Sequence, residues 1–194
     1  MSFNLPNALT WLRILLIPLF VAVFYLPDGW VPKHAINLTA TFIFALAAVT
    51  DWLDGWLARR LNQTSSFGAF LDPVADKFLV CASLLVLLDL GRLGRWGALF
   101  ALVIIGREIA ISALREWMAQ IGAARSVAVH MLGKLKTTAQ MVAIPFLLYD
   151  GLLFGVLPTR PWGTVLLAIA VVLTVWSMVY YLRKALPEIR AKAR

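Results

Sequence analysis

Four aspartates occur at regular spacing in a chain that is otherwise very apolar. They are Asp51, Asp54, Asp72 and Asp76, in the stretch DWLDGWLARRLNQTSSFGAFLDPVADK at residues 51–77. A carboxylate at the centre of a membrane helix costs about 2.5–3.5 kcal/mol, and clustered like charges add repulsion. Carboxylate oxygens bind Mg²⁺, Mn²⁺ or Ca²⁺, and two such ions about 3.5–4 Å apart form the clamp used for in-line phosphoryl chemistry. The acids therefore predict divalent-metal chemistry on a phosphate.

The four acids are expected on two helical faces that meet. The first face combines two aspartates with small and basic residues: Asp51, Asp54, Gly55, Ala58 and Arg59. At about 100° per residue, these five fall within an arc of about 140°. Gly68, Asp72 and Asp76 follow at i, i+4 and i+8 on the next helix. Pro73 leaves two possibilities for Asp72, which either caps this helix or lies at a slight kink.

The elements that must position these acids are membrane helices. Of the 194 residues, 61% are hydrophobic and 14% are charged, whereas about a quarter of the residues in a soluble domain are charged. A span needs about 20 largely apolar residues, and a helix satisfies its own backbone hydrogen bonds in lipid. The chain is therefore predicted to be one all-α integral membrane domain over residues 1–194. Its six transmembrane helices are expected at 8–26, 34–60, 68–90, 96–121, 130–154 and 162–184.

The basic residues predict the orientation of these spans. With a cytoplasmic N-terminus, ten Lys and Arg residues fall in cytoplasmic connections or the C-terminal tail and four fall outside, which is the bias of the positive-inside rule. The second helix then has Asp51 and Asp54 near its cytoplasmic end, and the third helix begins on the same side with Asp72 and Asp76. The four acids are therefore expected at one cytoplasmic site. The net charge of +8 is interpreted as a topology signal with attraction to anionic lipid. Binding of nucleic acid is not expected.

The spacing of this stretch resembles the signature of the CDP-alcohol phosphotransferase family. The order is Asp, two residues, Asp-Gly, two residues, Ala-Arg, eight residues, Gly, three residues, Asp, three residues, Asp. All eight fixed positions are present: Asp51, Asp54, Gly55, Ala58, Arg59, Gly68, Asp72 and Asp76. The resemblance implies a six-helix membrane enzyme, usually a homodimer, in which an alcohol displaces CMP from a CDP-linked lipid with the aid of two Mg²⁺ or Mn²⁺ ions.

The same resemblance implies roles for individual residues. Asp51, Asp54, Asp72 and Asp76 would hold the metals, and Asp76 would also take the proton from the attacking hydroxyl. The CDP-lipid would lie against Asp51, Gly55, Ala58, Arg59 and Gly68. Metal ions and a positioned base suit this reaction, because charge develops on the leaving CMP while the alcohol loses a proton.

Two further segments indicate the acceptor. NLPNALTWLRI at the start and residues 107–144 resemble the bacterial family members that use sn-glycerol 3-phosphate. The implied reaction converts CDP-diacylglycerol and sn-glycerol 3-phosphate into phosphatidylglycerophosphate and CMP. The implied location is the bacterial cytoplasmic membrane among its lipids, with the active site facing the cytoplasm.

A phosphorylated acceptor requires cations beyond the metals. We expect an acceptor-phosphate pocket formed by Arg107, Arg115, Lys134 and Lys136. Another interpretation stays open for each pair. Glu108 and Glu116 repeat the interval of the arginines, so Arg–Glu pairs could tie helices together, and the two lysines could be ordinary positive-inside residues.

The first span carries polar residues at every third position. Asn7, Thr10 and Arg13 share one helical face. They are candidates for contact with the nucleotide or the lipid diphosphate. An interfacial cap with a snorkelling arginine is the other interpretation.

Two alternative functions compete with this prediction. A related phosphotransferase could use inositol phosphate, serine or phosphatidylglycerol as its acceptor. A cation transporter would also place acids in the membrane, but its ion path predicts acids at several depths. Asp51, Asp54, Asp72 and Asp76 are instead expected at one end of their helices.

Overall fold

The computed structural model describes residues 5–61, 66–122 and 131–192. Within these ranges, the side chains of 5–7, 52, 54–61, 66–69, 131, 132, 134, 191 and 192 are outside the description. The chain is mostly helical. Its helices are α1 (Leu5–Ala22), the 3₁₀ turn η1 (Val23–Tyr25), α2 (Lys33–Leu61), α3 (Ser66–Asp89), α4 (Gly97–Gln120), α5 (Met131–Tyr149) and α6 (Thr159–Lys192). Two short strands, β1 (Leu152–Leu153) and β2 (Leu157–Pro158), lie between α5 and α6.

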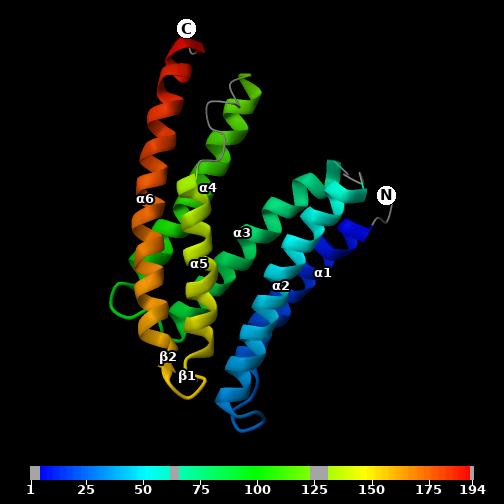
Figure 1. The fold of residues 1–194 in the computed structure, drawn as a ribbon, viewed down its shortest axis with the longest axis vertical. Helices are drawn as coiled ribbons and strands as arrows, with labels where there is room; N and C mark the ends of the chain where they lie inside the picture. The colour runs from blue at the N-terminus through cyan, green and yellow to red at the C-terminus, as the bar shows by residue number, and fades with distance from the viewer. Residues whose placement is uncertain (1–4, 62–65, 123–130, 193–194) are drawn as a thin grey trace.

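The helices form two groups that α3 connects (Figure 1). α1 and α2 run side by side in opposite directions, and α4, α5 and α6 form the second group. α3 contacts α1 and α2 as well as α4 and α5. The aspartates of α3 therefore lie on a helix that contacts both groups.

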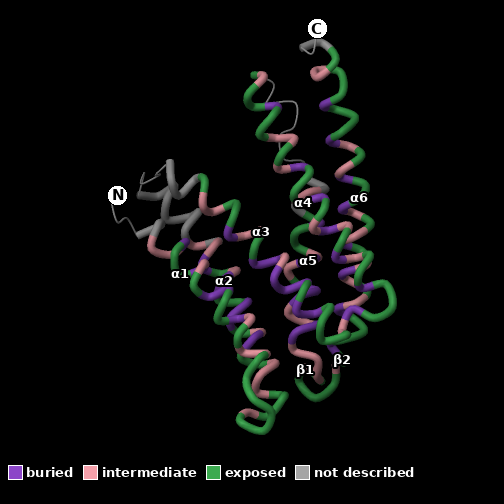
Figure 2. The backbone as a smooth tube through the Cα atoms, turned by 180° about the vertical axis from the view of Figure 1, so that it is seen from behind, coloured by how far each residue is buried: buried purple, intermediate pink, exposed green. Residues whose placement is uncertain are grey.

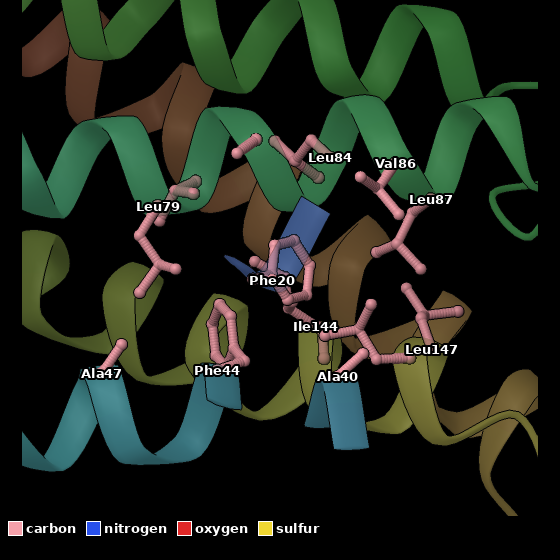
Figure 3. Packing of buried hydrophobic residues seen from close by; sticks show 14 of the residues in the cluster. Phe20, Ala40, Phe44, Ala47, Leu79, Leu84, Val86, Leu87, Ile144 and Leu147 are labelled. Atoms are coloured by element: carbon pink, nitrogen blue, oxygen red, sulfur yellow. The ribbon is translucent and has the colours of Figure 1, made fainter. Parts of the chain in front are cut away.

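The core lies where α1, α2, α3 and α5 meet (Figure 3). Phe20 and Phe44 are buried at its centre, with Leu84 of α3 and Ile144 of α5 around them. Burying such a side chain stabilises a fold by about 1.5–3 kcal/mol in water. In a membrane the same residues hold the helices together by close packing.

The outer faces of the helices are apolar as well. Leu15, Phe42, Leu102, Ile109 and Val172 are all more than 60% exposed, and exposed positions line the outside of both groups (Figure 2). A helix that is apolar on its exposed side as well as its buried side is typical of a membrane span.

Four helices of the described chain are long and apolar enough to cross a membrane. These windows are Ala8–Tyr25, Lys33–Asp51, Gly97–Gln120 and Thr159–Arg190. Six spans were expected, so α3 and α5 are the two that this criterion does not support. α3 carries Asp72, Asp76 and Lys77, and Lys134, Lys136 and Gln140 lower the mean hydropathy of α5. Crossing by these two helices stays a prediction.

The predicted ends of the last two helices were wrong. The fifth helix was expected to continue to residue 154, but it ends at Tyr149 and a hairpin follows, in which β1 pairs with β2 in antiparallel register. Asp150 and Phe154 adopt positive φ angles of 46° and 54°, which a helix does not tolerate. Thr159 closes the hairpin, because its Oγ1 accepts from Gly151 N–H and donates to the Gly151 carbonyl. α6 therefore begins at Thr159 and continues to Lys192, beyond the expected residue 184.

α5 and α6 approach each other closely at Gly163. A Cβ atom at this position would lie 2.8 Å from Leu147 Cγ and 3.1 Å from Phe146 Cβ. Glycine permits this contact because it has no side chain. The packing of α6 on α5 thus depends on one small residue near the start of α6.

The turn after α3 positions an arginine that links three parts of the fold. Gly91, at φ +65°, ends the helix with a Schellman arrangement, in which Arg92 N–H donates to Leu87 O and Gly91 N–H to Leu88 O. Arg92 then donates from NH1 to the carbonyls of Leu147 and Leu148, at 3.2 and 2.6 Å.

Arg92 also contacts two polar side chains at this end of the fold. Its NH2 donates to Asn37 Oδ1 at 2.6 Å, and its Nε lies 3.4 Å from Asp150 Oδ2. Burial lowers the pKa of the Arg92 guanidinium, and the carboxylate of Asp150 offsets part of this effect. Arg92 therefore caps the last turn of α5 and ties it to α2.

Replacing Arg92 tests this connection. Arg92→Met keeps a long apolar stem but leaves two carbonyls and the Asn37 amide without their donor, so we expect a loss of about 2–4 kcal/mol in the free energy of unfolding. Thermal unfolding in detergent measures the change. Arg95→Met is the matched control, because Arg95 is exposed in the same turn. Equal unfolding temperatures for the two variants would contradict the capping role.

Candidate functional site

Three helices bring polar residues together between the second half of α2 and the first half of α3. Arg13 of α1 is completely buried, and its NH1 lies 2.7 Å from Asp51 Oδ1 and 3.1 Å from Asp76 Oδ1. Asp51 belongs to α2 and Asp76 to α3. Two carboxylates on different helices thus converge on one cationic nitrogen.

Asp72 lies inside α3 and is not its cap. The helix begins six residues earlier at Ser66 and continues through Pro73. Thr10 Oγ1 donates to Asp72 Oδ1 at 2.5 Å, so α1 contacts this acid as well. The possibility that Asp72 caps the helix is therefore excluded.

The donor chemistry of this cluster suits a divalent cation. Asp51 and Asp76 place one oxygen each against the same positive atom of Arg13, and hard carboxylate oxygens are the ligands that Mg²⁺ and Mn²⁺ prefer. Among the residues that the structure describes, no three acidic, histidine or cysteine side chains lie close enough to hold an ion. The side chain of Asp54, the fourth predicted ligand, is outside that description.

A cavity of about 490 Å³ connects this cluster to α4 and α5. Its volume is in the usual range for a small-molecule site. Four basic and three acidic side chains line it: Lys77, Arg107, Arg115 and Lys136, with Asp72, Asp76 and Glu108. Two acids of the signature therefore share one cavity with three of the four residues expected to bind a phosphate.

The basic side of the cavity is organised around Glu108. Lys136 of α5 donates to Glu108 Oε1, and Arg107 NH1 lies 3.4 Å from the same oxygen. Lys136 is buried, with 3% of its side chain exposed. An ion pair with Glu108 therefore holds Lys136 inside the protein. The Arg–Glu contact considered from the sequence also exists, but it joins Arg107 and Glu108, which are neighbours on α4. Neither contact removes Arg107 or Lys136 from the wall of the cavity.

Several expected site residues have side chains outside the description. Their backbone positions are known: Asn7 lies in α1, Asp54, Gly55, Ala58 and Arg59 in α2, Gly68 in α3 and Lys134 in α5. Their predicted contacts stay predictions. Thr10 is described, and its contact is with Asp72.

Glu108 is a part of the site that the sequence did not assign to it. Arg13 was a candidate for contact with the nucleotide or the lipid diphosphate, but its pairing with Asp51 and Asp76 was not expected. Arg13 was noticed through its three-residue spacing with Asn7 and Thr10, and one interpretation made it a snorkelling residue. Its complete burial excludes that interpretation. The available signal was a cation on the polar face of an otherwise apolar helix. Glu108 follows Arg107 directly, and sequence alone could not show that it reaches Lys136 on another helix.

The chain belongs to the CDP-alcohol phosphatidyltransferase family, whose model matches residues 3–176. The family predicted from eight spaced residues is thereby confirmed. Enzymes of this family generally depend on divalent metal ions.

The chain is also similar to individual bacterial enzymes over nearly its whole length. Proteins of Escherichia coli (strain K12), Salmonella typhi and Shigella flexneri serotype 5b are each 51% identical to it over 191 residues. The match covers 95% of this chain and 96% of each relative. All three are named CDP-diacylglycerol–glycerol-3-phosphate 3-phosphatidyltransferase.

Substitution of Arg13 tests whether this cation holds the three helices together. Arg13→Met leaves Asp51 and Asp76 without their shared partner, and we expect a loss of about 2 kcal/mol in the free energy of unfolding, since both carboxylates are partly exposed. Arg13→Lys keeps the charge and should lose less. Thermal unfolding in detergent without divalent ions measures both. Arg183→Met, on the exposed side of α6, is the control, and a similar effect of the two methionine variants would argue against the role of Arg13.

Proposed function

We propose that this protein transfers the phosphatidyl group of CDP-diacylglycerol to sn-glycerol 3-phosphate, giving phosphatidylglycerophosphate and CMP. The 51% identity with enzymes named for this activity, over 95% of the chain, carries the proposal. A cavity that joins acidic residues of α3 to basic residues of α4 and α5 supports it. The protein is then a transferase of phospholipid biosynthesis.

The proposed location is the bacterial cytoplasmic membrane. Six helices would cross it, with the N-terminus and the active site on the cytoplasmic side. The distribution of Lys and Arg supports this orientation, and the apolar outer faces of the helices suit contact with lipid. Assembly as a homodimer is part of the proposal and follows from the family resemblance.

Two Mg²⁺ or Mn²⁺ ions are the proposed cofactors. Asp51, Asp54, Asp72 and Asp76 would hold them. When bound, the ions supply positive charge that stabilises the negative charge developing on the diphosphate. Arg13 supports this assignment, because a point where two carboxylates meet a buried cation is one where positive charge is favourable.

The proposed reaction is a displacement at phosphorus. A hydroxyl oxygen of the acceptor forms a bond to the phosphorus that carries the diacylglycerol, and the bond from that phosphorus to the oxygen of CMP breaks. Asp76 accepts the hydroxyl proton, and the leaving CMP keeps the electron pair of the broken bond. Asp76 lines the cavity, so an alcohol bound there can reach its carboxylate. Gly55, Ala58, Arg59 and Gly68, together with Asn7 and Thr10, are the proposed contacts of the CDP-lipid.

The basic wall of the cavity is the proposed site for the acceptor phosphate. Arg107, Arg115 and Lys136 line it, and Lys134 lies two residues before Lys136 on α5. The Nε atoms of Arg107 and Arg115 are buried and have no hydrogen-bond partner among the described residues. Three cationic side chains against one carboxylate, Glu108, leave this wall positively charged, so an anionic ligand suits it.

A panel of acceptors tests the proposed activity. Purified protein receives CDP-diacylglycerol, Mg²⁺ or Mn²⁺, and one of sn-glycerol 3-phosphate, inositol phosphate, serine or phosphatidylglycerol, and CMP release is followed. We expect turnover with sn-glycerol 3-phosphate far above that with the others, because relatives that are 51% identical are named for this acceptor, and the basic wall does not suit serine, which carries no phosphate. Turnover with inositol phosphate and none with sn-glycerol 3-phosphate would show that the acceptor assignment is wrong.

Removal of the proposed base tests the mechanism. Asp76→Asn keeps the shape of the side chain but cannot accept a proton, so we expect CMP release to fall by about 10²–10⁴-fold. Binding of CDP-diacylglycerol should stay measurable. Asp89→Asn is the matched control, since Asp89 is an exposed acid at the other end of the same helix. Near-normal turnover by Asp76→Asn would exclude its role as the base.

A further inference from the structure

Two residues of α6, Ser177 and Tyr181, contact the arginines of the basic wall. The guanidinium carbon of Arg115 lies 5.3 Å from the centre of the Tyr181 ring, and that of Arg107 lies 5.8 Å from it. Arg115 NH2 donates to the Tyr181 hydroxyl at 3.4 Å, and Arg107 NH2 donates to Ser177 Oγ at 3.3 Å. Both distances to the ring are in the range of cation–π attraction.

These contacts are buried and directional. Tyr181 and Ser177 are each 1% exposed and Arg107 is 8% exposed. The Ser177 hydroxyl donates to the carbonyl of Thr174 at 2.9 Å, which leaves its oxygen free to accept from Arg107. Ser177 thus orients Arg107 through its hydroxyl oxygen, and the ring of Tyr181 supports the guanidinium groups of both Arg107 and Arg115.

Orientation matters because arginine side chains have many rotamers. An arginine loses rotamer entropy when its side chain is fixed in one conformation. Because α6 already holds Arg107 and Arg115, these side chains lose less rotamer entropy when a phosphate binds. Both arginines line the cavity, and each keeps a buried Nε donor without a hydrogen-bond partner in the described part of the chain.

Ser177 and Tyr181 lie just after the part of the chain that the family model matches. The family model matches residues 3–176 and so ends just before Ser177. Arg107, Arg115 and Lys136 all lie within the matched range. The support of the basic wall therefore comes from a segment after the part matched by the family model.

We propose that Ser177 and Tyr181 are positioning residues that hold Arg107 and Arg115 in the geometry that binds the phosphate of the acceptor. The inference rests on the proposed function, because it names a determinant of acceptor affinity in the same cavity. It adds α6 to a site that otherwise consists of α1 to α5.

Substitutions at Tyr181 and Ser177 test the inference through steady-state kinetics. Tyr181→Leu removes the ring and should raise the KM for sn-glycerol 3-phosphate about tenfold, with little change in kcat or in the KM for CDP-diacylglycerol. Tyr181→Phe keeps the ring and should stay within about twofold of the wild type. Ser177→Ala should raise the same KM about threefold.

Two controls lie on the same helix. Trp176→Leu removes an exposed aromatic ring, and Thr164→Ala removes an exposed hydroxyl that donates to the Arg160 carbonyl four residues earlier. Both should leave the KM for sn-glycerol 3-phosphate near the wild-type value. The inference is overturned if Tyr181→Leu changes both KM values equally or neither. If Tyr181→Leu does not fold, Ser177→Ala serves as the test. An unchanged KM for sn-glycerol 3-phosphate in that variant then overturns the inference.

A binding measurement separates this inference from the proposed activity. Inorganic phosphate should raise the unfolding temperature of the wild-type protein, and Tyr181→Leu or Ser177→Ala should need more phosphate for the same rise. If the wild type releases no CMP with sn-glycerol 3-phosphate but shows this phosphate effect, the activity proposal fails and the positioning role stands. If the wild type turns over and neither variant differs from it in either assay, the positioning role fails and the activity stands.

Discussion

Charge inside an apolar helical bundle has to be paired, and the contact of Arg13 with Asp51 and Asp76 meets that constraint. An arginine with no exposed surface would be very costly without partners, and so would carboxylates that faced only each other. The pairing joins α1, α2 and α3 at one point. Thr10 and Asp72 add a second link between α1 and α3. The acidic half of the site therefore depends on a helix that carries none of the signature residues.

The basic half of the site is held by a different set of contacts. Glu108 binds Lys136 across the α4–α5 boundary, and α6 supports Arg107 and Arg115. α3 lies between the two halves and contacts helices of both groups. Most of the acids lie on α3 and most of the bases on α4 and α5, with Lys77 and Glu108 as the exceptions, and all of them line one cavity. Such separation suits a reaction in which metal ions act on a diphosphate on one side while an anionic acceptor binds on the other.

The sequence predicted the family and the helices of this protein better than the contacts between the helices. Eight spaced residues were enough to identify the family, whose model matches residues 3–176. The observed helices overlap the six predicted ranges, since long apolar runs form helices in lipid. The hairpin between α5 and α6 was missed, because the run LLFGVL is as apolar as the helices around it and its turn depends on positive φ angles. α3 and α5 carry more charged and polar residues than a standard span, so apolarity alone does not establish that they cross the membrane.

The sequence by itself determined which residues can do chemistry and on which face of a helix they lie, because helical periodicity follows from local backbone geometry. It also determined the family and the apolar surface of the bundle. Only the tertiary structure decided that Arg13 lies between Asp51 and Asp76, that Asp72 lies within α3, and that Ser177 and Tyr181 contact the arginines of α4. Some of these contacts join residues 70 or more positions apart in the chain. Their formation depends on how whole helices pack, which no local pattern of residues encodes.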